Sequence, residues 1–175
     1  MNALVSVITS ARNPEEVERT ETMLAAQTYP SLELVAPELG RDFDALIDDG
    51  STGSSAFLVG TYMAHGDFFA YVMPGDTYRP DHIALLVDLI QTSRAHFVYS
   101  QLGYGDDAIG GDPPRFGEVC GSCLMNRANL ILAENWRDGG KAYDWDLITR
   151  WLGIGARWGF LPRITVDRPA AEIEE

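Results

Sequence analysis

Three polar side chains stand where strands of this sequence are expected to end. Ser10, Glu38 and Asp76 each follow a segment of apolar or alternating residues. In parallel sheets, ligands bind outside the carboxyl ends of the strands. One hydroxyl and two carboxylates at such an edge offer oxygen atoms to a polar ligand, so the sequence predicts a binding site that includes these three residues.

Cys120 and Cys123 form a C-x-x-C spacing, which occurs in redox and zinc sites. A structural zinc needs four ligands, but no second cysteine pair exists and the three histidines are scattered along the chain. A thioredoxin-like pair should open a helix, whereas residues 119–125 are predicted to form a strand. We therefore expect buried or half-buried structural thiols without zinc.

The elements that must position these groups alternate between strand and helix. Strands are expected at residues 4–8, 31–36, 43–47, 68–73, 97–99, 119–125 and 158–166, and helices at residues 14–27, 56–64, 80–90, 128–133 and 144–152. Asn13 is placed to cap the first helix. The alternation predicts an α/β fold, with a mostly parallel central sheet and helices on both faces.

Composition narrows the class of protein. The 175 residues suit one domain, with a core at about residues 4–168 and a flexible, glycine-rich loop at about residues 103–117. The net charge of −13 argues against unassisted binding of nucleic acid. No apolar run reaches the length of a transmembrane helix, and we expect a cytoplasmic protein.

Five segments resemble, in the correct order, the family 2 glycosyltransferases of GT-A fold. They are VSVITSARN (5–13), AQTYPSLELV (26–35), AHGDFFAYVMPGDTYRPDHI (64–83), GSCLMNRANL (121–130) and YDWDLITRWLGIGARWGFLP (143–162). The resemblance implies a GT-A three-layer sandwich. It also implies a nucleotide-diphosphate sugar as donor, and a glycan or lipid-linked hydroxyl as acceptor.

The resemblance assigns roles to individual residues. Ser10, Ala11, Glu38 and Asp76 fall where the family binds the donor nucleotide. Asp76 also falls on the D-x-D site, where a divalent cation (Mn²⁺ or Mg²⁺) would bind with the diphosphate. Asp144 falls at the position of the general base of the inverting mechanism.

The chain also departs from the family pattern. The aspartate pair that follows the second strand in the family is replaced by Glu38 and Leu39, and the string of carboxylates before Asp76 is replaced by Met73-Pro74-Gly75. The second helix of the family is expected to be missing. The D-x-D motif is thus reduced to one carboxylate.

Each of the two aspartates has a structural interpretation beside the functional one. Asp76 could be an ordinary turn aspartate, and Asp144 could be the N-cap of the last helix. The leading hypothesis is an inverting glycosyltransferase-like enzyme. The alternatives are a catalytically degenerate GT-A domain that binds a nucleotide, a glycan or a protein, and an unrelated nucleotide-binding α/β enzyme.

Overall fold

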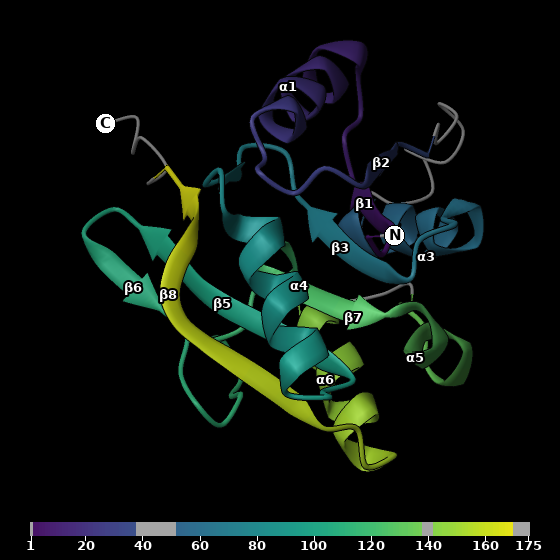
Figure 1. Ribbon diagram of the computed structural model, residues 1–175, viewed down its shortest axis with the longest axis vertical. Coiled ribbons are helices and arrows are strands. Elements are labelled where there is room, and N and C mark those ends of the chain that lie inside the picture. Colours follow the sequence, from purple (N-terminus) through teal and green to yellow (C-terminus); the bar gives the residue numbers. More distant parts are fainter. Residues whose placement is uncertain (1, 38–51, 138–141, 170–175) are drawn as a thin grey trace.

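The computed structural model describes residues 2–37, 52–137 and 142–169 (Figure 1). Their strands are β1 (Val5–Thr9), β2 (Leu32–Val35), β3 (Phe68–Val72), β4 (Thr77–Tyr78), β5 (Phe97–Tyr104), β6 (Asp107–Ile109), β7 (Leu124–Arg127) and β8 (Trp158–Arg168). Their helices are α1 (Pro14–Ala25), α3 (Thr52–Met63), α4 (His82–Thr92), α5 (Ala128–Ala133) and α6 (Tyr143–Gly153), with a 3-10 turn η1 (Gly121–Cys123). The strand predicted at residues 43–47 lies outside these ranges. Part of the segment in which the second helix of the family was expected to be missing also lies outside them. Within the ranges, every helix is too short or too polar to cross a bilayer.

The strands form one sheet in the order β2-β1-β3-β7-β5-β8-β4, with β6 paired to β5. β1 pairs in parallel with β2 and β3, and β5 pairs in parallel with β8. β7 runs antiparallel between β3 and β5, and β4 runs antiparallel to β8. The sheet is thus mostly parallel, as predicted, and the carboxyl ends of β1, β3, β5 and β8 point the same way.

Two apolar clusters lie on the two faces of the sheet. One joins β1, β3 and β5 to α1 and α4, and the other joins the same strands to α3, α5 and α6. Figure 1 shows α4 across one face, with α6 behind the sheet. All five residues of β1 and of β3 are buried, which explains why β3 is an unbroken apolar run and why β1 is mostly apolar, with Ser6 and Thr9 as its polar residues. The predicted three-layer α/β architecture is confirmed.

Local sequence signals place several helices correctly. The Asn13 side chain accepts the Glu16 N–H at 2.9 Å and so caps α1. The Glu16 carboxylate reaches back to the N–H of Arg12, at 2.7 Å, and satisfies a second free donor near the helix start. In α4 the apolar stripe of Ile83, Leu86, Val87 and Ile90 is buried, as helical spacing requires.

Two predicted segments differ from the structure. The strand expected at residues 119–125 begins only at Leu124, because η1 precedes it and the polar groups of η1 bind aspartate side chains instead of a neighbouring strand. The loop expected at residues 103–117 begins as a hairpin, in which Gly105-Asp106 joins β5 to β6. Gly105 has a φ of 57°, which this tight turn requires and which glycine adopts without steric cost.

Candidate functional site

Ser10 and Asp76 lie at the same edge of the sheet, as the sequence predicted. The Ser10 N–H donates to the Val72 carbonyl at 3.2 Å, so the residue after β1 is held beside the last residue of β3. Asp76 follows in a turn that its N–H closes on the Met73 carbonyl, at 3.1 Å. Ala11 is tied to the end of β1, since its N–H donates to Thr9 Oγ1 at 3.1 Å. Glu38 lies outside the described residues.

Asp76 is anchored by an arginine that sequence reasoning missed. Arg168 Nε donates to Asp76 Oδ1 at 2.6 Å, and Arg168 Nη2 donates to Asp76 Oδ2 at 2.7 Å. Ser122 Oγ donates to Asp76 Oδ2 as well. The Asp76 side chain is 1% exposed, whereas that of Arg168 is 33% exposed.

The register of two strands explains this meeting. β4 pairs with β8 so that Thr77 lies opposite Asp167 and Tyr78 lies opposite Val166. One residue further along each strand places Asp76 beside Arg168. The sequence predicts a last strand that ends at Val166, which leaves Arg168 outside the candidate residues. The only local signal for Arg168 is that it is a basic residue shortly after a predicted strand.

Asp144 lies in the first turn of α6 and does not cap it, because the N-cap residue is Ala142. The structural interpretation of Asp144 as an N-cap is therefore wrong. Its Oδ2 instead accepts the Gly121 N–H of η1 at 2.9 Å. Burial raises the pKa of the Asp144 carboxyl group, against hydrogen bonds and the charge of Arg168, which lower it.

Arg168 also contacts two sulfur atoms at the site. Its Nη2 lies 3.1 Å from Cys120 Sγ and 3.7 Å from Met73 Sδ. Tyr143 Oη, at the start of α6, lies 3.4 Å from the Sδ atom of Met73, which directly follows β3. The hydrogen bond with Cys123 and the charge of Arg168 lower the pKa of the Cys120 thiol, although burial acts in the opposite direction. Both cysteines are free.

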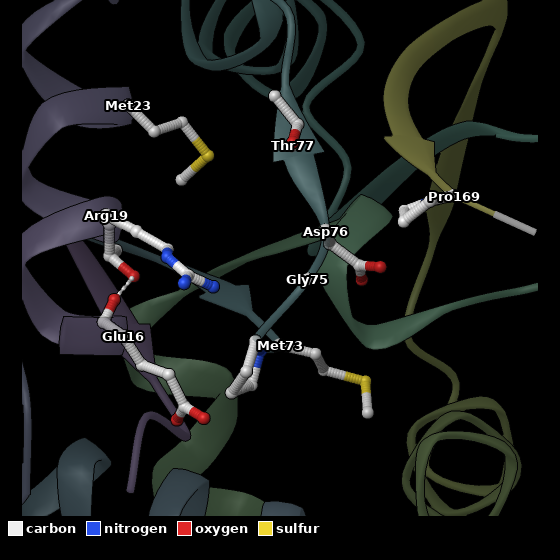
Figure 2. A pocket seen from close by; sticks show the side chains of 10 residues that line it. Glu16, Arg19, Met23, Met73, Gly75, Asp76, Thr77 and Pro169 are labelled. Atoms are coloured by element: carbon white, nitrogen blue, oxygen red, sulfur yellow. Dashed lines mark hydrogen bonds between the residues drawn. The ribbon is translucent and has the colours of Figure 1, made fainter. Parts of the chain in front are cut away.

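Two cavities share Met73 as a lining residue. The smaller, of about 280 Å³, is lined by residues that include Met73, Cys120, Tyr143, Asp144 and Arg168. The larger, of about 550 Å³, lies between α1 and the turn that carries Asp76. Figure 2 shows this larger cavity, with Asp76 turned away from Arg19 of α1 and toward Pro169. The smaller cavity thus brings together the predicted base and the unpredicted arginine.

The arrangement around Asp76 does not fit a resident divalent cation. Such a cation needs free carboxylate oxygens and further oxygen ligands, but both Asp76 oxygens accept hydrogen bonds from Arg168, and Met73 offers only a thioether. Within residues 2–37, 52–137 and 142–169, no three His, Cys, Asp or Glu side chains are grouped to hold a metal. A metal role for Asp76 stays a prediction.

Comparison with known proteins identifies the fold. The chain matches no protein-family model and no curated protein. Among solved structures it is similar to S. aureus TarS 1–349 in complex with UDP-GlcNAc, with a TM-score of 0.69, 14% identity, and coverage of 98% of this chain and 60% of that one. It is also similar to the mannosyltransferase PcManGT from Pyrobaculum calidifontis in complex with GDP-Man and Mn²⁺, with a TM-score of 0.73, 13% identity, and coverage of 99% and 59%.

These likenesses confirm the predicted GT-A fold. At such low identity they do not extend to an activity, and the chain spans less than two thirds of the length of either structure, and 37% of a longer TarS structure. One of the two structures is a complex with both GDP-Man and Mn²⁺. Whether this chain binds a divalent cation depends on the residues at its own site.

Proposed function

We propose that this chain is a glycosyltransferase-like protein that binds a nucleotide-diphosphate sugar at the carboxyl edge of its sheet and transfers the sugar, with inversion, to an acceptor hydroxyl. The observation that carries the proposal is that Asp144 and Arg168 line one cavity at that edge. A carboxylate and a fixed cation are the two groups that the reaction needs, one for the acceptor proton and one for the departing anion. The GT-A fold supports the proposal by analogy.

Asp144 acts as the general base in this proposal. Its carboxylate takes the proton of the acceptor hydroxyl as the acceptor oxygen forms a bond to the anomeric carbon. The bond from that carbon to the diphosphate oxygen breaks, and its electron pair leaves with the nucleotide diphosphate. Apart from its own backbone N–H, the Asp144 carboxylate accepts a hydrogen bond from one described residue, through the Gly121 N–H. Its oxygens therefore retain lone pairs that can take up a proton.

The donor nucleotide lies against Ser10, Ala11 and Asp76 in the same proposal, with Glu38 contributing from the next strand end. Ser10 and Asp76 support this assignment, because β1 and β3 end side by side. The acceptor is a glycan or lipid-linked hydroxyl, which the smaller cavity would receive. UDP, UDP-GlcNAc and GDP-Man, which the similar structures contain, are the first donors to test.

A second candidate is a GT-A domain that binds its ligand without turnover. The Asp76–Arg168 ion pair favours it, because the pair fills the place where a metal-dependent enzyme needs a free carboxylate. The two candidates make different predictions for Asp144. An enzyme needs this carboxylate for turnover, whereas a binding module does not.

The test measures binding and turnover separately. Calorimetry with UDP, GDP and dTDP reports nucleotide binding, and release of UDP or GDP from the sugar donors reports turnover. Asp144→Asn should bind nucleotide like the wild-type chain and lose turnover. Asp146→Asn is the matched control, since Asp146 lies on the same helix and pairs with Arg150. A folded wild-type chain that binds none of the nucleotides would refute the proposal, and binding with turnover that Asp144→Asn leaves intact would refute the role of Asp144.

A further inference from the structure

Arg168 occupies the place of the expected metal with a permanent positive charge. We propose that Arg168, held by Asp76, is the diphosphate-binding group of the site and that nucleotide diphosphates bind without a divalent cation. The inference rests on the proposed function, because it concerns the donor of that same site. It reverses the role of Asp76, which becomes a positioning residue for the arginine and not a metal ligand.

The ion pair has the geometry of an anchor. Two guanidinium nitrogens of Arg168 lie 2.6 and 2.7 Å from the two oxygens of Asp76, a bidentate arrangement that fixes the plane of the guanidinium. Ser122 holds the same carboxylate from the opposite loop and accepts the Met73 N–H at 3.1 Å. Asp76 is the buried member of the ion pair, and Arg168 is the member that is partly exposed to solvent. Asp76 therefore fixes the orientation in which Arg168 meets a ligand.

The guanidinium retains donors for an anion. Arg168 uses Nε and Nη2 in its contacts, and its Nη1 makes no hydrogen bond to any described residue. Arg168 also lines the cavity that contains Asp144. An anion that binds Nη1 from this cavity lies in the same space as the base, which is where a leaving diphosphate is needed.

The chemistry of the neighbours favours an arginine over a metal. Guanidinium binds phosphate oxygens through several directed donors and stays charged at every physiological pH. A divalent cation next to Asp76 would have to displace Arg168 or lie beside its charge, and the Met73 side chain offers that cation no oxygen. Because Asp76 balances one positive charge, Arg168 contributes directed hydrogen bonds more than net charge. We therefore expect the loss of the Arg168 guanidinium to lower the affinity for diphosphate by a moderate factor.

Binding to the wild-type chain tests the metal independence directly. Calorimetry with pyrophosphate, UDP and GDP is performed in excess EDTA and again with Mn²⁺. We expect the same affinity in both conditions for the ligands that bind. Binding that appears only with Mn²⁺ would overturn the inference and leave the proposed function standing, whereas no binding in either condition by the folded chain would overturn both.

Variants then test the residue. Arg168→Met should weaken pyrophosphate and nucleotide diphosphate binding by roughly 10- to 100-fold and leave binding of the corresponding nucleoside unchanged. Arg79→Met is the matched control, because Arg79 makes a similar bidentate contact, at 2.9 Å to both oxygens of Asp167, but does not line the cavity. Equal diphosphate affinity in Arg168→Met and wild type would overturn the inference.

Removing Arg168 leaves a buried carboxylate without its partner, so the fold itself has to be checked. Arg168→Lys keeps the charge but loses the bidentate fork, and it should stay folded by thermal melting while binding diphosphate more weakly than wild type. An Arg168→Lys chain that folds and binds diphosphate as tightly as wild type would contradict the role of the fork. The EDTA comparison on the wild-type chain holds whichever variant folds.

Discussion

Stability and function make opposite demands on Asp144. Burial raises the pKa of its carboxyl group, so the folded chain holds the proton more tightly than the unfolded chain does. Ionised Asp144 therefore lowers stability once the pH exceeds the ordinary value of 3.8, while the proposed base role requires the ionised form. Such a conflict is typical of functional residues.

The raised pKa of Asp144 predicts the pH dependence of turnover. As the pH falls through this pKa, Asp144 becomes protonated and can no longer accept the acceptor proton. We expect the acid limb of the kcat/KM profile to lie above the 3.8 of an ordinary aspartate. Asp144→Asn should lower kcat by about 10²- to 10⁴-fold without lowering the Tm at neutral pH, since an amide oxygen can still accept the Gly121 N–H. An acid limb at the ordinary value would contradict this origin.

At the scale of elements, α3 packs directly on β1 because residue 60 is a glycine. A Cβ at Gly60 would lie 2.2 Å from Ile8 Cγ2, which is inside the van der Waals distance. Gly153, near the end of α6, has no heavy atom within 4 Å of the same position. The two glycines thus differ in the space around them.

This difference predicts opposite effects of the same substitution. Gly60→Ala should lower the free energy of unfolding by about 1–3 kcal/mol, because α3 has to move away from β1. Gly153→Ala should raise it by about 0.5–1 kcal/mol, because alanine loses less conformational freedom in a helix. Urea unfolding of both variants measures the effects. A stabilised Gly60→Ala variant would show that α3 and β1 are less tightly packed than described.

His82 connects α4 to β8 from a buried position. Its Nδ1 lies 2.7 Å from Thr165 Oγ1. The Thr165 hydroxyl donates its proton to Ser100 Oγ at 2.7 Å, so Nδ1 of His82 must be the donor in the bond between His82 and Thr165. Its Nε2 is buried and has no hydrogen-bond partner among the described residues. Burial lowers the pKa of His82 to about 3, from an ordinary value of 6.5.

The lowered pKa makes stability depend on pH. Above pH 6.5, His82 is neutral in both the folded and the unfolded chain and has no effect. As the pH falls from 6.5 to about 3, only the unfolded chain takes up the proton, so His82 lowers stability by up to about 1.4 kcal/mol per pH unit. His82→Phe should make the pH dependence of urea unfolding shallower between pH 7 and about pH 5. Equal slopes in the two proteins would contradict a buried neutral imidazole.

At the scale of the whole molecule, the net charge of −13 produces repulsion within the compact state. Raising the ionic strength from about 0.01 M to about 0.15 M shortens the screening length from about 30 Å to about 8 Å. We therefore expect the Tm to rise with added NaCl. Choline chloride at the same ionic strength is the control for specific sodium binding. A Tm that falls with both salts would mean that favourable ion pairs outweigh the repulsion.

The sequence alone determined most of the elements and the edge of the sheet at which the candidate site lies. Buried parallel strands read as apolar runs, helices show their buried face at helical spacing, and Asn13 marks a helix start, because each of these signals is local. The placement of Ser10 and Asp76 at one edge followed from the parallel order of β1 and β3, since parallel strands end on the same side.

Only the tertiary structure decided the partners of the site residues. Arg168 and Asp76 are 92 residues apart, and Gly121 and Asp144 are 23 apart. These contacts depend on the order of the strands and on the β4–β8 register, which no local pattern encodes. Nothing in the composition distinguishes Arg168 from the other residues among the 13 lysines and arginines. Whether Asp76 faces a metal or a guanidinium was therefore fixed by folding, because the answer depends on which strand lies beside it.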